Sequence, residues 1–501
     1  MSIVDDSSEV ILAIDQGTTS TKCVCLSRTG AVLFSTSASL SMHCPRDEWM
    51  EQSPSEIVES VRQVLLRAVE FCNSTSKHVR GIAISNQRET ALAWNRETGE
   101  PLGQAISWQC RRSDAICRKL AGEAENFRQT TGLLLDPLVT ASKWHWMLYE
   151  SEFAQQAQAL AREGELCFGN VDAWLIYWLT RGEVHATDHT NASRTGLLNL
   201  ERLEWDEQML QMFGIPSSAL PALRMSADQF GVCHVIDQLK GIPIVSAIGD
   251  SHAALAAQGP SAAVKATYGT GSSLMAAVST LPKECPQLAR TVACTTPQGV
   301  RYAIEGNIAM TGSAVRWVGE FLGLPHSVDD VVALAAIVAD SAGVIFVPAM
   351  AGLGAPYWDA AARGSVHNLG PWHTSAHLAR AAIDAIAFQV ADVFEAMEVV
   401  SGTRLNEVHA DGGATRNREL MQFQADILGR DVLRSGREEL SAIGAGWLGG
   451  MTLGWWRSTD EPYRTTEPGE RFSVQMDAPV REKLRSAWKD AVGRTLTQRG
   501  A

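Results

Sequence analysis

Two turns rich in glycine and hydroxyl side chains, one in each half of the chain, constrain the fold more than any other feature of the sequence. The apolar run Val10–Ile14 ends in Asp15-Gln16-Gly17-Thr18-Thr19-Ser20, and a second strand is expected from Cys23. The same succession returns at Tyr268-Gly269-Thr270-Gly271-Ser272-Ser273. Such turns direct backbone N–H groups and hydroxyls at one point, which a polyphosphate requires. One turn of this kind is more often only a tight turn, but the pair predicts two similar α/β units that face each other across a cleft.

The segments around these turns predict sheets that are covered by helices. Ser53-Pro54-Ser55-Glu56 has the pattern of a capping box with proline at the first helical position, and apolar residues then recur at helical spacing as far as Ala68. We expect an amphipathic helix there. The segment Leu440–Trp456 is free of charge but carries five glycines. We therefore expect it to be buried core with close backbone contacts rather than a membrane span.

A third glycine turn lies in the last quarter of the chain. Residues 408–411 have the composition of a strand, and Gly412-Gly413-Ala414 leads from it towards a helix over residues 419–428. Glycines at this junction let a flat ring approach the backbone. A connection between strand and helix that requires a left-handed backbone conformation explains these glycines at least as well.

Composition and missing motifs exclude several classes of protein. The chain has 501 residues, and at about 100 to 200 residues per domain two large lobes are expected. Its net charge of −13 disfavours nucleic acid and anionic membranes as partners. The sequence contains no H-E-x-x-H, no G-x-x-x-x-G-K-[ST] and no G-x-G-x-x-G after a strand. A metalloprotease, a P-loop NTPase or a Rossmann dehydrogenase is therefore not expected.

The cysteines and the N-terminal residues indicate in which cellular compartment the protein is expected. The ten cysteines include no C-x-x-C pair, which indicates reduced thiols rather than a zinc site or a disulfide framework. Asp5, Asp6 and Glu9 precede the first apolar run, without a basic leader. We therefore expect no secretory signal and a cytoplasmic location.

Several motifs, taken in order, resemble those of one family. The three turns are similar to the nucleotide-binding elements of the actin, Hsp70 and hexokinase superfamily. The finer motifs resemble those of the FGGY carbohydrate kinases, glycerol kinase branch: Asp15–Ser20, Asn86-Gln87-Arg88-Glu89-Thr90, Trp108–Arg112, Lys143-Trp144-His145-Trp146, Thr187–Thr195, Tyr268–Gly271 and Gly352–Asp359. The resemblance implies an α/β fold of two ribonuclease-H-like lobes with a central cleft. Residues 1–258 would carry the substrate site and a phosphate loop, and residues 259–501 the nucleotide site.

The resemblance implies an enzyme that transfers the γ-phosphoryl group of ATP, with Mg²⁺, to a primary hydroxyl of a polyol or sugar. Asp250 would be the catalytic base, although an Asp after a strand can also serve only as a helix cap. Asp15 would face the metal. The nucleotide-binding residues would be Thr18, Thr19, Ser20, Lys22, Thr270, Gly271, Gly312, Gly413, Ala414 and Asn417. A small residue at Gly312 could instead serve only helix packing.

The acceptor pocket departs from the glycerol kinase pattern at three positions. Glycerol kinases hold their substrate with an Arg-Glu pair, a Trp, a Tyr, an Asp-Gln pair and a Phe. The matching positions here are Arg88, Glu89, Trp108 and Asp250, whereas the Tyr, Gln and Phe positions are Leu138, Ser251 and Ser273. A pocket without these groups discriminates differently between substrates. We expect this pocket to be wider and more hydrophilic than that of glycerol kinases. It would suit a longer polyol or a ketose, such as a tetritol or a pentulose. Glycerol is the alternative if neighbouring side chains refill the space.

A second class of function stays open at this point. An ATP-driven conformational switch of the actin or Hsp70 type would use the same nucleotide turns. It would not need the constellation of Arg88, Glu89, Trp108 and Asp250. We therefore expect a kinase of a small molecule, with no nucleic-acid or membrane partner, and we further expect a homo-oligomer.

Overall fold

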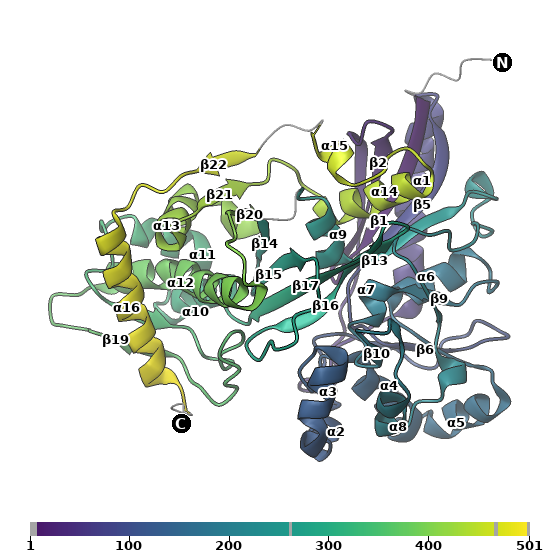
Figure 1. The fold of residues 1–501 in the computed structure, drawn as a ribbon, viewed down its shortest axis with the longest axis horizontal. Helices are drawn as coiled ribbons and strands as arrows, with labels where there is room; N and C mark the ends of the chain where they lie inside the picture. The colour runs from purple at the N-terminus through teal and green to yellow at the C-terminus, as the bar shows by residue number, and fades with distance from the viewer. Residues whose placement is uncertain (1–7, 260–262, 465–468, 498–501) are drawn as a thin grey trace.

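The chain folds into two lobes, each built on one large β-sheet (Figure 1). This computed structural model describes residues 8–259, 263–464 and 469–497. The outer ends of the two predicted domains therefore lie outside the described residues. The first lobe is on the right of Figure 1 and the second on the left, and strands of both meet in the middle of the molecule.

The first sheet has five strands in the order β13-β5-β1-β2-β3. They are β1 (Glu9–Gln16), β2 (Ser20–Ser27), β3 (Val32–Ser39), β5 (His78–Asn86) and β13 (Ile244–Gly249). β1, β2 and β3 form an antiparallel meander, whereas β1, β5 and β13 run parallel. The N–H of Gly17 donates to the Ser20 carbonyl at 3.0 Å and closes the first turn. The strand–turn–strand opening predicted from the sequence is confirmed.

The second sheet has seven strands in the order β16-β17-β15-β14-β20-β21-β22. They are β14 (Ala263–Tyr268), β15 (Ser272–Val278), β16 (Ala289–Thr296), β17 (Gly299–Ile308), β20 (Glu407–Asp411), β21 (Asp431–Arg434) and β22 (Glu470–Phe472). β14, β15 and β17 form an antiparallel meander, and β14, β20 and β21 run parallel. This central part repeats the connectivity of the first sheet. The predicted duplicated α/β fold is therefore confirmed.

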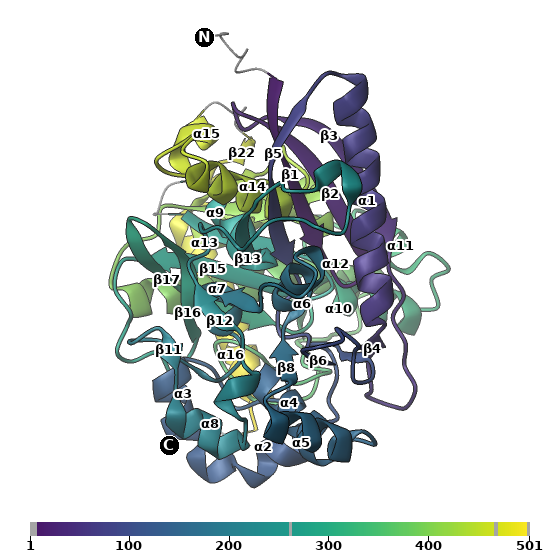
Figure 2. The same ribbon diagram turned by 90° about the vertical axis from the view of Figure 1, so that its right-hand side faces the viewer.

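Helix α1 (Pro54–Ser74) covers one face of the first sheet, as Figure 2 shows. It begins where the capping box predicts, because the Ser53 hydroxyl accepts a hydrogen bond from the Glu56 N–H at 3.2 Å. Side chains alternate between the two faces of a strand. Leu12 of β1 accordingly packs in the core with α1 and α6 (Val171–Leu179), and Ile11 packs in a second core on the opposite face.

Helix α14 (Leu440–Thr452) belongs to the second half of the sequence but packs on the first sheet, beside β1 and β2 in Figure 1. It shares this face with α9 (Asp250–Ala256). A Cβ on Gly444 would overlap the backbone of Ala253, and one on Gly446 would overlap Leu26. The expectation of buried core with close backbone contacts is confirmed. The first lobe is thus completed by a segment that follows the second sheet in sequence.

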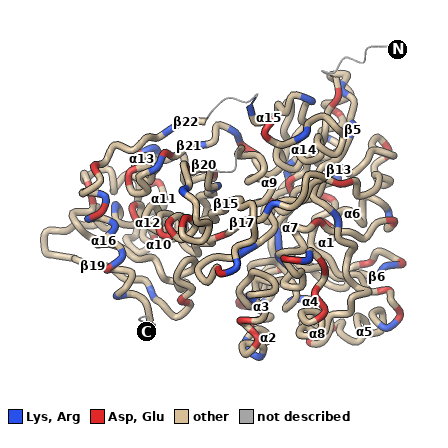
Figure 3. The backbone as a smooth tube through the Cα atoms, viewed as in Figure 1, with Lys and Arg blue, Asp and Glu red and all other residues tan. Residues whose placement is uncertain are grey.

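The remaining helices pack around these sheets or form a helical layer at the lower end of the first lobe (Figures 1 and 2). In the first half they are α2 (Asp114–Lys119), α3 (Ala124–Thr131), α4 (Thr140–Tyr149), α5 (Ala154–Glu163), α7 (His189–Ala192) and α8 (Glu207–Phe213); in the second half they are α10 (Gly312–Phe321), α11 (Ser327–Ala335), α12 (Ser375–Ser401), α13 (Arg418–Leu428), α15 (Asp460–Arg464) and α16 (Ala478–Thr495). Within the described ranges, none of the helices is long and apolar enough to cross a membrane. Basic and acidic residues are interspersed over both lobes (Figure 3).

Candidate active site

A cleft of about 750 Å³ opens between the lobes, and a cavity of about 790 Å³ extends from it into the second lobe. The first lobe contributes Asp15, Lys22 and Asp250 to the cleft wall, and the second contributes Asp411. Gly413 and Arg416 line both spaces, so that the cleft and the cavity adjoin. An elongated ligand can therefore lie with one end among the carboxylates and the other in the cavity.

The second glycine turn lines the cavity through Gly269 and Thr270, and the first turn lies between Asp15 and Lys22, which line the cleft. In the first turn Thr18 and Ser20 are half-buried, and Thr19 is exposed. In the second turn Thr270 is exposed and lines the cavity, while the Gly271 carbonyl accepts a hydrogen bond from the Gly269 N–H at 2.9 Å. Thr270 is thus open to a ligand in the cavity, whereas none of residues 17–20 is among those that line either space.

Asp15 lies at the end of β1, on the wall of the cleft. The Ser85 hydroxyl donates to its Oδ1 at 3.0 Å. Burial, together with the negative charges of Asp250 and Glu439, raises the pKa of Asp15 to about 7. Lys22 reaches Glu439 at the start of α14, with 2.8 Å between Nζ and Oε2. A carboxylate whose neighbours are also negative is an environment that a bound cation would stabilise.

Five of the predicted nucleotide residues line the 790 Å³ cavity: Thr270, Gly312, Gly413, Ala414 and Asn417. The Gly312 N–H donates to the Gly269 carbonyl at 3.1 Å, and a Cβ on Gly312 would lie 2.6 Å from the same oxygen. Glycine is therefore required at this position for α10 to approach the turn. The Asn417 side-chain oxygen accepts from the Leu420 N–H at 3.1 Å and caps α13.

Asp250 follows β13 directly and is the first residue of α9. The cap of this helix is Gly249, so Asp250 is not held by that role. Its side chain is 36% exposed, and the Nε of Arg88 lies 3.2 Å from its Oδ1. A carboxylate in this position can accept a proton from a hydroxyl that enters the cleft.

Other predicted acceptor residues adjoin Asp250 or the first turn. Arg88 contacts Asp250, and Glu89 follows it in a left-handed backbone conformation with φ of 60°. The indole N–H of Trp108 donates to the Thr18 hydroxyl at 2.9 Å. The structure therefore joins one predicted acceptor residue to the first glycine turn.

The three positions that depart from the glycerol kinase pattern differ in their contacts. The Ser251 hydroxyl accepts from Arg88 Nη2, and the Ser273 hydroxyl donates to Glu305 Oε1, each at 3.3 Å. Arg88 and Glu305 form an ion pair at 2.9 Å, so both serines meet the same pair. Leu138 is half-buried, and its carbonyl accepts from the Lys143 ammonium group at 2.6 Å.

The sequence analysis missed several buried charged residues at this site. Glu305 is fully buried, and Arg194 and Lys143 are almost or fully buried. Burial lowers the pKa of Lys143 to about 8. Arg194 and Lys143 stand in motifs that the resemblance includes, but neither received a role. The available signal for Glu305 was an acid that directly follows two apolar residues, Ala303 and Ile304, within a strand.

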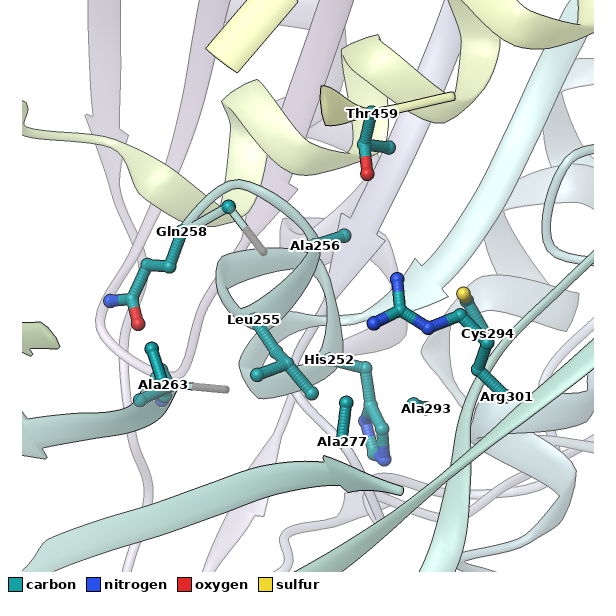
Figure 4. A pocket seen from close by; sticks show the side chains of 12 residues that line it. His252, Leu255, Ala256, Gln258, Ala263, Ala277, Ala293, Cys294, Arg301 and Thr459 are labelled. Carbon is teal, nitrogen blue, oxygen red and sulfur yellow. The ribbon is translucent and has the colours of Figure 1, made fainter. Parts of the chain in front are cut away.

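A much smaller cavity of about 30 Å³ lies next to α9, the helix that begins at Asp250 (Figure 4). His252, Leu255 and Gln258 line one side, and Cys294 and Arg301 line the other. This volume suffices for about one or two water molecules. Burial lowers the pKa of His252 well below its ordinary value, so the ring is neutral. The cavity is too small for a nucleotide or a sugar, and the cleft is the candidate site.

Comparisons with family models and with curated proteins cover almost the whole chain. Residues 10–257 match the N-terminal domain of the FGGY family of carbohydrate kinases, and residues 264–453 match its C-terminal domain. An apulose kinase of Pectobacterium atrosepticum is 44% identical, over 97% of this chain and 98% of that protein. A glycerol kinase of Burkholderia pseudomallei is 41% identical, over 97% of both chains.

Comparison with solved structures agrees with this. The structure of Plasmodium falciparum glycerol kinase with ADP is similar with a TM-score of 0.90 and 30% identity, covering 98% of this chain and 99% of that one. A ligand-bound xylulose kinase of Lactobacillus acidophilus has a TM-score of 0.87 at 22% identity, covering 97% of this chain and 98% of that one. The second likeness concerns the fold alone.

Proposed function

Because this chain belongs to the FGGY family of carbohydrate kinases, we propose that it phosphorylates a primary hydroxyl of a five-carbon ketose or a polyol of similar length. The chain is an enzyme, a transferase that moves the γ-phosphoryl group of ATP to an alcohol group of a sugar or polyol. It uses ATP with Mg²⁺. This activity sets aside the alternative of an ATP-driven switch.

The residues around Asp15 fit a magnesium ion. Mg²⁺ prefers oxygen ligands and keeps several waters between itself and one or two carboxylates. Across the described ranges no three His, Cys, Asp or Glu side chains are grouped so as to enclose a metal. Asp15 would hold the ion, with Asp250 nearby. When bound, Mg²⁺ supplies neutralisation of charge on the phosphate oxygens.

We assign to Asp250 the proton of the acceptor hydroxyl. As the acceptor oxygen forms its bond to the γ-phosphorus, the bond from that phosphorus to the bridging oxygen of ADP breaks and Asp250 takes the hydroxyl proton. The support for this role is its exposure to the cleft and its contact with Arg88 at 3.2 Å. Arg88 and Glu89 would bind acceptor hydroxyls, and Trp108 would pack against the acceptor's carbon chain.

We assign the triphosphate to the two glycine turns and the adenosine to the 790 Å³ cavity. Thr18, Thr19, Ser20, Thr270 and Gly271 would meet the phosphates through hydroxyls and N–H groups, and Gly312, Gly413, Ala414 and Asn417 would border the adenosine. Lys22 would act beside them through its ion pair with Glu439. This division gives most of the acceptor contacts to residues 1–258, with Ser273 from the second lobe, and most of the nucleotide contacts to residues 259–501.

The serine pair carries the proposal of a longer acceptor. Ser251 and Ser273 present hydroxyls, where glycerol kinases carry an amide and an aromatic ring, and both lie beside the Arg88–Glu305 ion pair. Small polar side chains leave more room and can meet additional hydroxyl or carbonyl oxygens. Glycerol is the second candidate, because Arg88, Glu89, Trp108 and Asp250 match the glycerol kinase pattern.

Kinetics on a panel of glycerol, erythritol, xylulose and apulose test the acceptor. We expect kcat/KM to be at least about tenfold higher for one of the two ketoses than for glycerol, since lost pocket donors are worth roughly this much. A clear preference for glycerol would refute the longer acceptor. In the double variant S251Q/S273F the preference should move towards glycerol. Ser217→Gln, at an exposed position of the same lobe, is the matched control and should leave it unchanged.

We further propose that the enzyme acts in the cytoplasm as a homo-oligomer. All ten cysteines are free thiols, which is typical of a reducing compartment. The oligomer stays a prediction, and light scattering coupled to size-exclusion chromatography tests it.

A further inference from the structure

A buried carboxylate of the second lobe contacts two arginines of the first. Glu305 lies on β17 and is fully buried. Its Oε1 accepts from Arg88 Nη1 at 2.9 Å, and its Oε2 lies 2.9 Å from Arg194 Nη1. The side chain of Arg88 is 11% exposed and that of Arg194 only 3%. Both carboxylate oxygens of Glu305 therefore contact arginines of the first lobe.

The two arginines extend this contact to the proposed acceptor-binding residues. Arg88 is itself one of them, and its Nε lies 3.2 Å from Asp250. The Nε of Arg194 donates to Glu89 Oε1 at 2.5 Å, and Glu89 is 5% exposed. Glu305 thus holds Arg88 directly and Glu89 through one intermediate.

The charges of Arg88 and Arg194 explain why a neutral side chain cannot replace the carboxylate of Glu305. Burial by itself would raise the pKa of Glu305, but the guanidinium groups of Arg194 and Arg88 outweigh it and hold that pKa well below its usual range. The carboxylate is therefore ionised at every physiological pH. Without it, two buried guanidinium groups would lie close together with less compensating charge, and both would be expected to move.

We propose that Glu305 is a positioning residue for the acceptor, which fixes Arg88 and Glu89 from across the cleft. The proposal rests on the proposed function in one respect, namely that Arg88 and Glu89 bind the acceptor. It adds that a residue of the second lobe fixes two acceptor-binding residues, Arg88 and Glu89, that belong to the first. Ser273 takes part in the same unit, since its hydroxyl donates to Glu305 Oε1.

The test is Glu305→Gln, which keeps the shape and removes the charge. We expect KM for the best acceptor among glycerol, erythritol, xylulose and apulose to rise roughly ten- to a hundredfold, because bonds to charged groups are lost. KM for ATP should change less than about twofold, since no nucleotide contact is touched. Glu305→Asp should restore part of the loss. In the Arg88→Met background, Glu305→Gln should raise KM by a smaller factor than in the wild type, because only the effect through Arg194 and Glu89 is left.

Asp392→Asn is the matched control. Asp392 is another buried carboxylate of the second lobe, paired with Arg485 at 2.8 Å, and it joins α12 to α16 outside the cleft. It should lower thermal stability without raising KM for the acceptor. If Glu305→Gln behaves in the same way, or raises KM for ATP as much as for the acceptor, the positioning role is refuted.

Hydrogen exchange supplies a readout that needs no acceptor. In Glu305→Gln the backbone of residues 86–90, which carries Arg88 and Glu89, should exchange faster than in the wild type or in Asp392→Asn. If exchange in this segment is unchanged, the positioning role of Glu305 is refuted. If no compound of the panel is phosphorylated, only the proposed substrate class is contradicted, and the exchange experiment still tests Glu305. Should Glu305→Gln fail to fold, Arg194→Lys tests the same arrangement. It should raise KM for the acceptor and accelerate the same segment, and no change would overturn the inference.

Discussion

Trp108 donates its indole N–H to the hydroxyl of Thr18 at 2.9 Å, and this bond joins a proposed acceptor residue to the first glycine turn. Thr18→Val removes the bond and leaves the shape. One hydrogen bond is worth about 1 kcal/mol, so we expect KM to rise roughly fivefold for both ATP and the acceptor in steady-state assays. Thr36→Val, on β3 of the same sheet, should change neither. An effect on one substrate only would contradict the link.

Asp250→Asn tests the proposed base. The amide keeps a polar group at the cleft but cannot accept the hydroxyl proton, so kcat should fall by about 10² to 10⁴. ADP binding, measured by calorimetry, should persist, because the nucleotide cavity lies in the second lobe. Asp237→Asn is the matched control at another helix start of the first lobe. A variant of Asp250 with nearly normal kcat would disprove the assignment.

Gly312→Ala should weaken nucleotide binding. The added Cβ would lie 2.6 Å from the Gly269 carbonyl oxygen, which forces the turn or α10 to shift. We expect KM for ATP to rise about tenfold or more, because misplaced phosphate contacts are costly, with KM for the acceptor nearly unchanged. Gly493→Ala has open space around it on α16 and should be neutral or slightly stabilising. Equal kinetics for both variants would show that the close approach is unimportant.

The raised pKa of Asp172 leads us to expect that folding stability depends on pH. Burial and the neighbouring Asp188 raise its pKa from 3.8 to about 7. Between these two values the folded state binds more protons than the unfolded state. Stability should therefore fall as the pH rises through this window, by up to about 1.4 kcal/mol per pH unit from this group.

Thermal unfolding of Asp172→Asn at pH 5 to 7.5 checks this expectation. The variant cannot titrate, so its Tm should fall less steeply with pH than that of the wild type. Asp490→Asn, at an exposed position on α16, should keep the wild-type slope. Parallel curves for all three proteins would mean that Asp172 does not titrate in this range.

Local features made much of this fold predictable from the sequence. The Ser53 capping box and the turn at Gly17 depend on residues close together in the chain, and the structure forms both. The packing of α14 against the first sheet was not predictable, because glycine content indicates a close approach but not to which partner. The Glu305–Arg194 contact was missed for the same reason: it joins strands and loops of different lobes, and neither residue has a distinctive local pattern.

The placement of α14 has a consequence for how the polypeptide is made. Ribosomes synthesise the first sheet long before they reach residue 440, and until then α14 is missing from the apolar face that it shares with α9. An expressed fragment that stops at residue 258 should consequently aggregate or recruit chaperones, and adding the separately produced remainder should rescue it. In this enzyme the first lobe can complete its hydrophobic core only when nearly the whole chain has been synthesised.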